Sequence, residues 1–342
     1  MRFKKLFKRN EFYVGITIVA LSILIQIRSG QFFTGNNFVD LARAMIIPGM
    51  LTMGVMMQII SGGIDVSFPA IAMLSMYTTV KVALSIDFQG SMVFMFLFST
   101  MLGLVMGLMN GALVCWLKLP AFIITLGTGS IFLGFMQAVL KSRNIGILPK
   151  PMRVLSKTYL LTAHNETLGI SSSLPFVFIF LIVAVALTSF LLRYTMLGRG
   201  IYALGGDRDA CQRAGYNVNA IQMFIYGTMG ALAGFTGLTR AVLMGSCQPT
   251  SLIGYEMTCI AAVVLGGTRI SGGHGTVYGT LMGALLLTMI SNSLILLGVP
   301  TYWSKFVTGL LIIIGTGMSA YQALQQRKKL AGKYPVEEEK QV

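Results

Sequence analysis

The stretch LGRGIYALGGDRDACQRAGYNVNA, residues 197–220, is the longest polar interruption in a chain otherwise made of hydrophobic runs. Gly205 and Gly206 permit a tight turn, and Asp207 can cap a helix that begins after it. Gly215 can close that helix after about two turns. The pattern therefore predicts a short helical stub between two longer elements.

One face of this predicted stub carries small side chains. Ala210, Cys211 and Ala214 are spaced i, i+1 and i+4, so they share one face, and small side chains permit the close approach of another backbone. Arg208 and Arg213 lie off that face. Two interpretations remain open: a docking surface for another protein, or an ordinary loop, since Gly and Asp mark turns in many loops.

The composition of the whole chain is that of a membrane protein. The 342 residues are 55% hydrophobic and 11% charged, with repeated apolar runs of about 20 residues. In a soluble protein, a net charge of +15 would suggest that the partner is a nucleic acid. Here the basic residues lie in tails and loops between apolar runs, which is typical of membrane topology, and no nucleic-acid partner is expected.

Ten apolar runs predict an all-α, polytopic membrane protein with about ten transmembrane helices. The predicted helices are 11–27, 38–60, 68–84, 91–117, 121–140, 174–193, 221–242, 252–265, 276–297 and 303–321. The third and the eighth are short or broken by glycine, and such breaks survive in a bilayer only where protein or a water-filled cavity covers them.

The distribution of Lys and Arg predicts that both termini are cytoplasmic. Residues 1–10 would form a basic cytoplasmic N-terminus, without a cleavable signal peptide, and residues 11–321 the membrane domain. Within that domain, 197–220 would be cytoplasmic and 141–173 an external segment. Residues 322–342 would form a charged cytoplasmic tail beside the lipid surface.

No catalytic or metal site emerges from the sequence. The cysteines and histidines are scattered, without a CxxC pair or ligand spacing: Cys115, Cys211, Cys247, Cys259, His164 and His274. No GxxxxGK[ST] phosphate loop occurs, so the chain is not expected to bind ATP. The absence of a regular Arg series and of a carbonyl filter motif also disfavours a channel.

The motif GGIDVS at 62–67 places Asp65 between two apolar runs. A carboxylate at membrane depth costs about 2.5 to 3.5 kcal/mol on insertion scales, so Asp65 needs a reason to be there. Asp65 or Ser67 would cap the third helix, with Pro69 in its first turn, and the motif could also form a cytoplasmic gate, since neither interpretation excludes the other. The motif is echoed by GGTRIS at 266–271, but six positions are too few to establish an internal repeat.

Other polar groups interrupt apolar helices. The glycines of GLMNG at 107–111 predict close helix packing, whereas Asn110, Thr125 and Thr128 are candidates for facing a hydrated cavity. Glu256 begins the short eighth helix near the outer face, where the helix dipole stabilises a carboxylate. A structural cap is the simpler interpretation of Glu256.

Four motifs in order resemble the membrane permease subunit of bacterial sugar ABC importers, the ribose, galactose and autoinducer-2 class. They are SGGIDVS, GLMNGALVCWLKLPAFIITLGT, YALGGDRDACQRAGYNVNAI and GYEMTCIAAVVLGGTRISGGHGTVYGTLMGALL. The chain departs from the family at Phe68–Pro69, where a small apolar residue and Gly are usual.

The resemblance implies a permease that pairs with a second copy or a paralogue in the bacterial inner membrane. Its partners would be two cytoplasmic ATP-binding subunits, which hold ATP and Mg, and a periplasmic or secreted solute-binding protein. The coupling loop that enters the ATPase would include Gly205, Gly206, Asp207, Ala210, Ala214, Gly215, Asn217 and Val218.

We therefore expect import of a monosaccharide or related small polar solute, without bond chemistry or a cofactor on this chain. The alternatives are a branched-chain amino-acid permease of the related class, which GGIDVS disfavours, and an ion-coupled secondary transporter that would carry its own coupling site. A membrane-embedded enzyme lacks an assembled catalytic group.

Overall fold

The computed structural model describes residues 10–165 and 169–293, together with residues 303, 306, 309, 310, 313 and 317. Its helices are α2 (Asn10–Ser29), α3 (Gly35–Ile60), α4 (Phe68–Ser85), α5 (Met92–Leu117), α6 (Ala121–Ala138), α7 (Lys150–Ser156), α8 (Phe178–Tyr194), α9 (Met196–Gly206), α10 (Arg208–Arg213), α11 (Val218–Met244), α12 (Tyr255–Leu265) and α13 (Val277–Ser293). The strands β1 (Tyr159–Asn165) and β2 (Ile170–Pro175) form an antiparallel pair.

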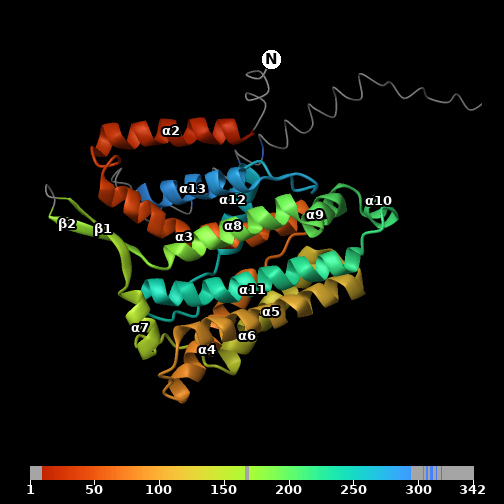
Figure 1. Ribbon diagram of the computed structural model, residues 1–342, viewed down its shortest axis with the longest axis horizontal. Helices are drawn as coiled ribbons and strands as arrows, with labels where there is room; N and C mark the ends of the chain where they lie inside the picture. The colour runs from red at the N-terminus through yellow and green to blue at the C-terminus, as the bar shows by residue number, and fades with distance from the viewer. Residues whose placement is uncertain are drawn as a thin grey trace, which may run out of the picture.

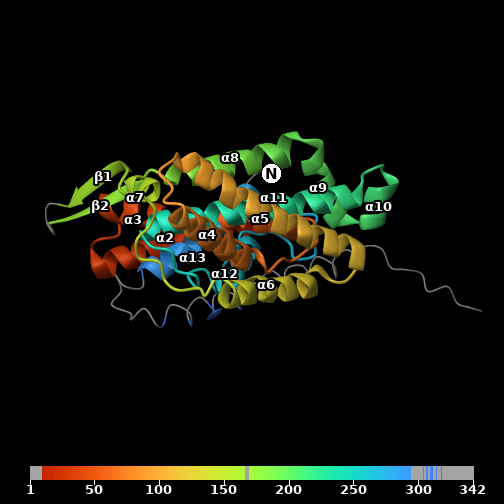
Figure 2. The ribbon, with the colours of Figure 1, turned by 90° about the horizontal axis from the view of Figure 1, so that it is seen from below.

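The long helices run side by side along the longest axis of the molecule (Figure 1). The β1–β2 pair lies at one end, which we call the hairpin end, and α9 and α10 lie at the other, the stub end. A view turned by 90° shows the same separation of the two ends, with α6 and α8 on opposite sides of the bundle (Figure 2). The helix α3 is buried along most of its length and forms the centre of the packing.

Six described helices are long and apolar enough to cross a membrane, and a seventh span results if α8 and α9, which meet at a bend of 75°, are counted as one. The prediction of an all-α polytopic membrane protein is therefore confirmed. The count of ten spans and the cytoplasmic location of both termini stay predictions. Residues 1–9, 318–342 and most of the tenth predicted helix lie outside the described residues.

The predicted external segment 141–173 contains ordered elements that the sequence did not predict. It includes α7 and most of the hairpin, in which His164 pairs with Ser171 and Thr162 with Ser173. Residues 174 and 175, predicted as the start of a helix, complete β2 instead, so α8 begins only at Phe178.

The helix α9 corrects the prediction for residues 197–206. Gly205 and Gly206 do not form a turn but are the last residues of α9. The Thr195 hydroxyl caps this helix by accepting a hydrogen bond from the Gly198 N–H at 3.0 Å. Ile201 and Leu204 are buried on its inner face, and this packing outweighs the low helix propensity of the glycines.

The helices α5 and α11 approach each other through glycines. A Cβ atom on Gly103 would collide with the carbonyl oxygen of Gly230, and one on Gly107 with that of Tyr226. The Ser99 hydroxyl donates to the Gly234 carbonyl at 2.7 Å along the same seam. Small residues spaced by four allow such backbone contact in membranes, so the predicted packing role of the glycines in 107–111 is confirmed for Gly107.

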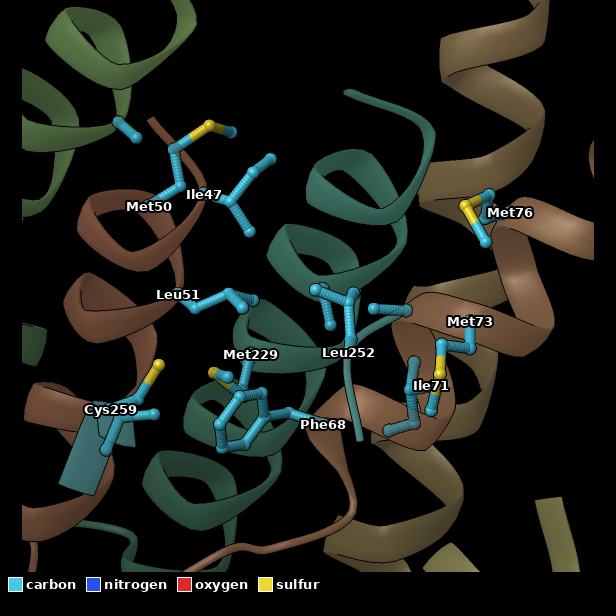
Figure 3. Packing of buried hydrophobic residues seen from close by; sticks show 14 of the residues in the cluster. Ile47, Met50, Leu51, Phe68, Ile71, Met73, Met76, Met229, Leu252 and Cys259 are labelled. Atoms are coloured by element: carbon cyan, nitrogen blue, oxygen red, sulfur yellow. The ribbon is translucent and has the colours of Figure 1, made fainter. Parts of the chain in front are cut away.

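The start of α4 lies in the hydrophobic core. The Phe68 ring is fully buried and lies beside Met229 of α11 (Figure 3). Leu252, which precedes α12, is also fully buried there. Pro69 occupies the first turn of α4, where its missing N–H leaves no hydrogen bond unmade. The bulky Phe68 and the proline are thus compatible with a regular helix start.

Candidate functional site

The predicted stub is present as α10. The Asp207 carboxylate caps it by accepting a hydrogen bond from the Ala210 N–H at 2.9 Å, and this bond lowers the pKa of Asp207. Gly215 follows the last turn with φ +87°, a conformation that favours glycine. Asn217 then caps α11 through the Ala220 N–H at 3.0 Å. The predicted cap and closing glycine are confirmed.

The predicted small-residue face of α10 is only partly correct. Ala210 and Ala214 are exposed, but Cys211 is buried, with its thiol 4.0 Å from the Gly200 carbonyl oxygen of α9. Burial also raises the pKa of the Cys211 thiol. The helix α10 packs back on α9 through Cys211, so of the three small side chains only Ala210 and Ala214, the C-cap residue, remain exposed.

A tight backbone junction joins α9 to the rest of the stub end. A Cβ atom on Gly205 would collide with the carbonyl oxygen of Ile60, the last residue of α3, and with the N–H of Gly273. That N–H donates to the same Ile60 carbonyl at 2.8 Å. The Tyr202 hydroxyl donates to the Gly275 carbonyl at 2.8 Å. The end of α3, the end of α9 and the α12–α13 connection therefore form one contact, which we call the Gly205 junction.

A cavity of about 1070 Å³ opens beside this junction. Most predicted coupling residues line it: Gly205, Gly206, Asp207, Gly215, Asn217 and Val218. Gly62 and Gly63 of the α3–α4 connection form another part of the wall, and Tyr226 of α11 a third. The predicted coupling loop and the predicted gate motif therefore share one cavity, although the sequence separates them by more than a hundred residues.

Asp65 is buried in a network of neutral hydrogen-bond donors. Its carboxylate accepts from the Gln58 amide at 2.8 Å, from the Ser67 N–H at 2.7 Å and from the Ser67 hydroxyl at 2.6 Å. Ser67 in turn accepts from the Asn110 amide at 2.7 Å. The Val66 N–H donates to the Thr125 hydroxyl at 3.2 Å. The connection is thus bonded to α3, α5 and α6 at once.

This geometry refines the capping hypothesis. Ser67 occupies the N-cap position of α4, but its side chain makes no cap bond. Asp65 instead holds the backbone of Ser67, so it fixes the approach to the helix. Asn110 and Thr125 are fully buried, and neither lines the large cavity, contrary to the prediction that they face a hydrated space.

Thr128 and Glu256 lie outside the Asp65 network. Thr128 is buried and donates to the Thr125 carbonyl at 3.3 Å within α6, so it also departs from its predicted role. Glu256 accepts a hydrogen bond from the Gly254 N–H at 3.1 Å, as expected for a carboxylate at a helix start. It also lines a cavity of about 160 Å³ together with Val66 and Pro69, and its location near the outer face stays a prediction.

Two members of the site were missed by sequence reasoning. Gln58 holds Asp65, and Tyr226 lines the cavity near Gly63. Gln58 gives a usable signal, because it is a polar residue inside the apolar run MMQII. Tyr226 gives none, because an aromatic residue in a transmembrane helix is ordinary. Within the described residues, no group of three or more His, Cys, Asp or Glu side chains could hold a metal ion.

The fold defines a multi-pass helical membrane protein with buried polar groups, and comparison with known proteins identifies its family as permeases. Residues 37–315 match the family described as branched-chain amino acid transport system / permease component, and the chain belongs to it. It is a multi-pass protein of the bacterial inner membrane.

The relatives are permeases named for autoinducer 2 import. The chain is 33% identical over 298 residues to the autoinducer 2 import system permease protein LsrC of Yersinia enterocolitica, covering 87% of this chain and 79% of that protein. It is 32% identical over 310 residues to LsrC of Photorhabdus laumondii, covering 90% and 89%. These matches confirm the resemblance to permeases of sugar ABC importers. No solved structure is significantly similar to the chain.

Proposed function

We propose that this chain is the membrane subunit of an ABC importer that moves a monosaccharide or related small polar solute into the cell. In this proposal the stub end faces the cytoplasm and the hairpin end faces outward. ATP and Mg are bound by separate cytoplasmic subunits, and a periplasmic or secreted protein delivers the solute. A second copy or a paralogue completes the path in the lipid bilayer.

The Gly205 junction is the observation that carries the proposal. The exposed alanines of α10 offer a surface for an ATP-binding subunit, and α9 connects that surface directly to the Ile60 carbonyl. Ile60 precedes the Gly62–Gly63 wall of the cavity. Because the contact is between backbones, a displacement of α9 has no flexible side chain to absorb it. Movement of α10 would therefore reach the predicted gate.

The Asp65 network has a defined part in this mechanism. It fixes the connection between α3 and α4 through hydrogen bonds to three helices, so the connection moves as one piece. In the proposal this piece forms the cytoplasmic gate, while the Asp65 network keeps its shape. Glu256 is a second pathway candidate, since a carboxylate beside apolar helices needs a polar neighbour.

The family description supports a second candidate solute, a branched-chain amino acid. Autoinducer 2, named in the curated relatives, supports the sugar-like candidate. A binding screen on the partner solute-binding protein with D-ribose, autoinducer 2 and L-leucine separates them. Heat stabilisation by L-leucine alone would replace the sugar assignment with the amino-acid assignment.

The docking function of α10 is tested by Ala214→Glu. The substitution brings a bulky charge to the exposed C-cap position of α10, so the chain should still fold while contact with an ATP-binding subunit is lost. An unpaired charge at such an interface costs about 2 to 5 kcal/mol, which weakens association by tens to thousands of times. The measurement is pull-down of the ATP-binding subunit together with solute uptake in cells.

Arg208→Ala is the matched control, because it removes an exposed charge from the same short helix. An exposed charge contributes only about 0 to 1 kcal/mol, so this variant should retain the partner. If Ala214→Glu binds the ATP-binding subunit and transports normally, α10 is not the docking element.

A further inference from the structure

A second polar cavity, of about 460 Å³, lies toward the hairpin end, between α3, α11, α12 and α13. Its polar wall consists of Asn37, Asp40, Arg43, Arg240, Tyr255 and Asn292. Ile47, which belongs to the core shown in Figure 3, also lines it. The volume lies in the range of about 300 to 1,000 Å³ that is usual for small-molecule sites.

Two arginines in this cavity make few hydrogen bonds to the described part of the chain. The Nε atom of Arg240 is buried and has no hydrogen-bond partner among the described residues. Arg43 is exposed, and among the described residues its side chain donates one long bond, from Nη2 to the Leu243 carbonyl at 3.4 Å. Both lie in helices apolar enough to span a membrane, where an ionised side chain is costly and marks a functional site by default. A guanidinium group carries five donors, so most of theirs remain available.

The cavity also offers an acceptor. One Asp40 oxygen accepts a hydrogen bond from the Ser172 hydroxyl of β2 at 3.0 Å. The carboxylate is exposed, and its other lone pairs remain available as acceptors. A simple anion would be attracted by the two arginines and repelled by Asp40. A hydroxyl group both donates and accepts, so it satisfies the guanidinium groups and the carboxylate together. The mixed wall therefore favours a solute with several hydroxyl groups over an anion.

We propose that this cavity is a recognition site for a polyhydroxylated, sugar-like solute, in which Arg43 and Arg240 donate to solute oxygens and Asp40 accepts from solute hydroxyls. The inference deepens the proposed function and rests on it for the outward orientation of the hairpin end. The permease itself then selects the solute, before the solute reaches the cavity at the stub end.

The site can be tested without transport. Ala44 lines the cavity and is partly exposed, so Ala44→Cys provides a thiol there, in a full-length chain that also carries Cys115→Ser and is held in lipid nanodiscs. Alkylation by a maleimide is timed with D-ribose, D-galactose, autoinducer 2, L-leucine or inorganic phosphate present. At least one of the three hydroxylated probes should slow the alkylation, and Arg240→Gln should weaken that protection on the order of tenfold to a hundredfold.

Arg28→Gln is the matched control, because Arg28 is an exposed arginine in the last turn of α2, outside the cavity. It should leave the protection unchanged. Absence of protection by every hydroxylated probe, or protection by phosphate alone, would overturn the proposal. So would equal protection in the presence and absence of the Arg240 guanidinium group.

A transport assay separates this proposal from the broader one. In the importer assembled with its ATP-binding subunits, Arg240→Gln should raise the half-saturating concentration for uptake while the complex stays intact. If the unmodified chain forms no complex with the ATP-binding subunits, the importer assignment is rejected. The alkylation result would still decide whether the cavity binds a solute. Unchanged uptake by Arg240→Gln in an active importer would reject the site alone.

Discussion

The connections that follow α3 and α12 leave their helices through the same turn. Gly62 has φ +84° and Gly267 has φ +92°. The next N–H reaches back to the helix in both cases, from Gly63 to the Gln58 carbonyl at 3.0 Å and from Thr268 to the Val263 carbonyl at 3.2 Å. Gly62 thus corresponds to Gly267, one residue away from the alignment that the motifs GGIDVS and GGTRIS suggest.

Beyond this turn the two connections differ. In the first, Asp65 is buried and bonded to Gln58 and Ser67. In the second, Arg269 is exposed, and its N–H donates to the His274 carbonyl within the connection. The first connection spans only residues 61–67 and enters the bundle directly, whereas the second spans 266–276 and reaches α9. Similar turn sequences therefore specify how a helix ends, not where the chain goes next.

The largest effect on solute uptake is expected where the second connection meets α9, from Gly205→Val. Its side chain has no room between the Ile60 carbonyl and the Gly273 N–H, and both neighbours are backbone. Overpacking of a rigid site costs about 1 to 3 kcal/mol or more. We expect a clear fall in the melting temperature of the purified chain and loss of solute uptake.

Gly206→Ala is the control for this prediction, because an added Cβ at Gly206 meets nothing within 4 Å. It should melt and transport as the unmodified chain does. A Gly205→Val variant that behaves like Gly206→Ala would show that the junction yields, and that α9 does not transmit movement through it.

The next effect concerns the first connection, through Asp65→Leu and Asp65→Asn. Leucine leaves the Ser67 N–H, the Ser67 hydroxyl and the Gln58 amide without their acceptor, at about 1 to 3 kcal/mol for each buried group. Asparagine keeps one acceptor oxygen, and the Gln58 amide can turn, since its Oε1 atom is buried without a partner. We expect Asp65→Leu to lose more thermal stability and more uptake than Asp65→Asn. Equal, severe loss of uptake in both, at matched membrane levels, would show that transport needs the charge itself.

Much of the fold could be predicted from the sequence, because hydrophobic runs and capping residues are local signals. The runs at 68–84 and 91–117 match α4 and α5 within one residue at each end. The helix α9 was missed because its stability comes from burial of Ile201 and Leu204, which outweighs the glycines of its last turn. The hairpin was missed because its strands are stabilised by pairing with each other, which no single segment reveals.

The sequence predicted which polar residues belong to the site better than it predicted how they are arranged. Asp65, Ser67, Asn110 and Thr125 were all chosen as polar groups in apolar surroundings, and the structure brings them together. Their burial away from the large cavity depends on how α5 and α6 pack, which is set by contacts between distant segments. The same holds for Cys211, whose direction depends on α9.

The smallest effect is expected from Thr268→Val, which closes the comparison of the two connections. The Thr268 hydroxyl is buried and has no hydrogen-bond partner in the described part of the chain. It therefore costs stability in the folded chain, and a methyl group of similar shape removes that cost. The melting temperature should stay the same or rise slightly.

The counterpart of Thr268→Val in the first connection is Ser67→Ala. This change removes a donor from Asp65 and leaves the Asn110 amide unpaired, which should lower the free energy of unfolding by about 1 to 3 kcal/mol. Thermal unfolding of both variants in one detergent gives the comparison. If Thr268→Val unfolds as early as Ser67→Ala, the two connections carry comparable polar networks, and the contrast drawn between them does not hold.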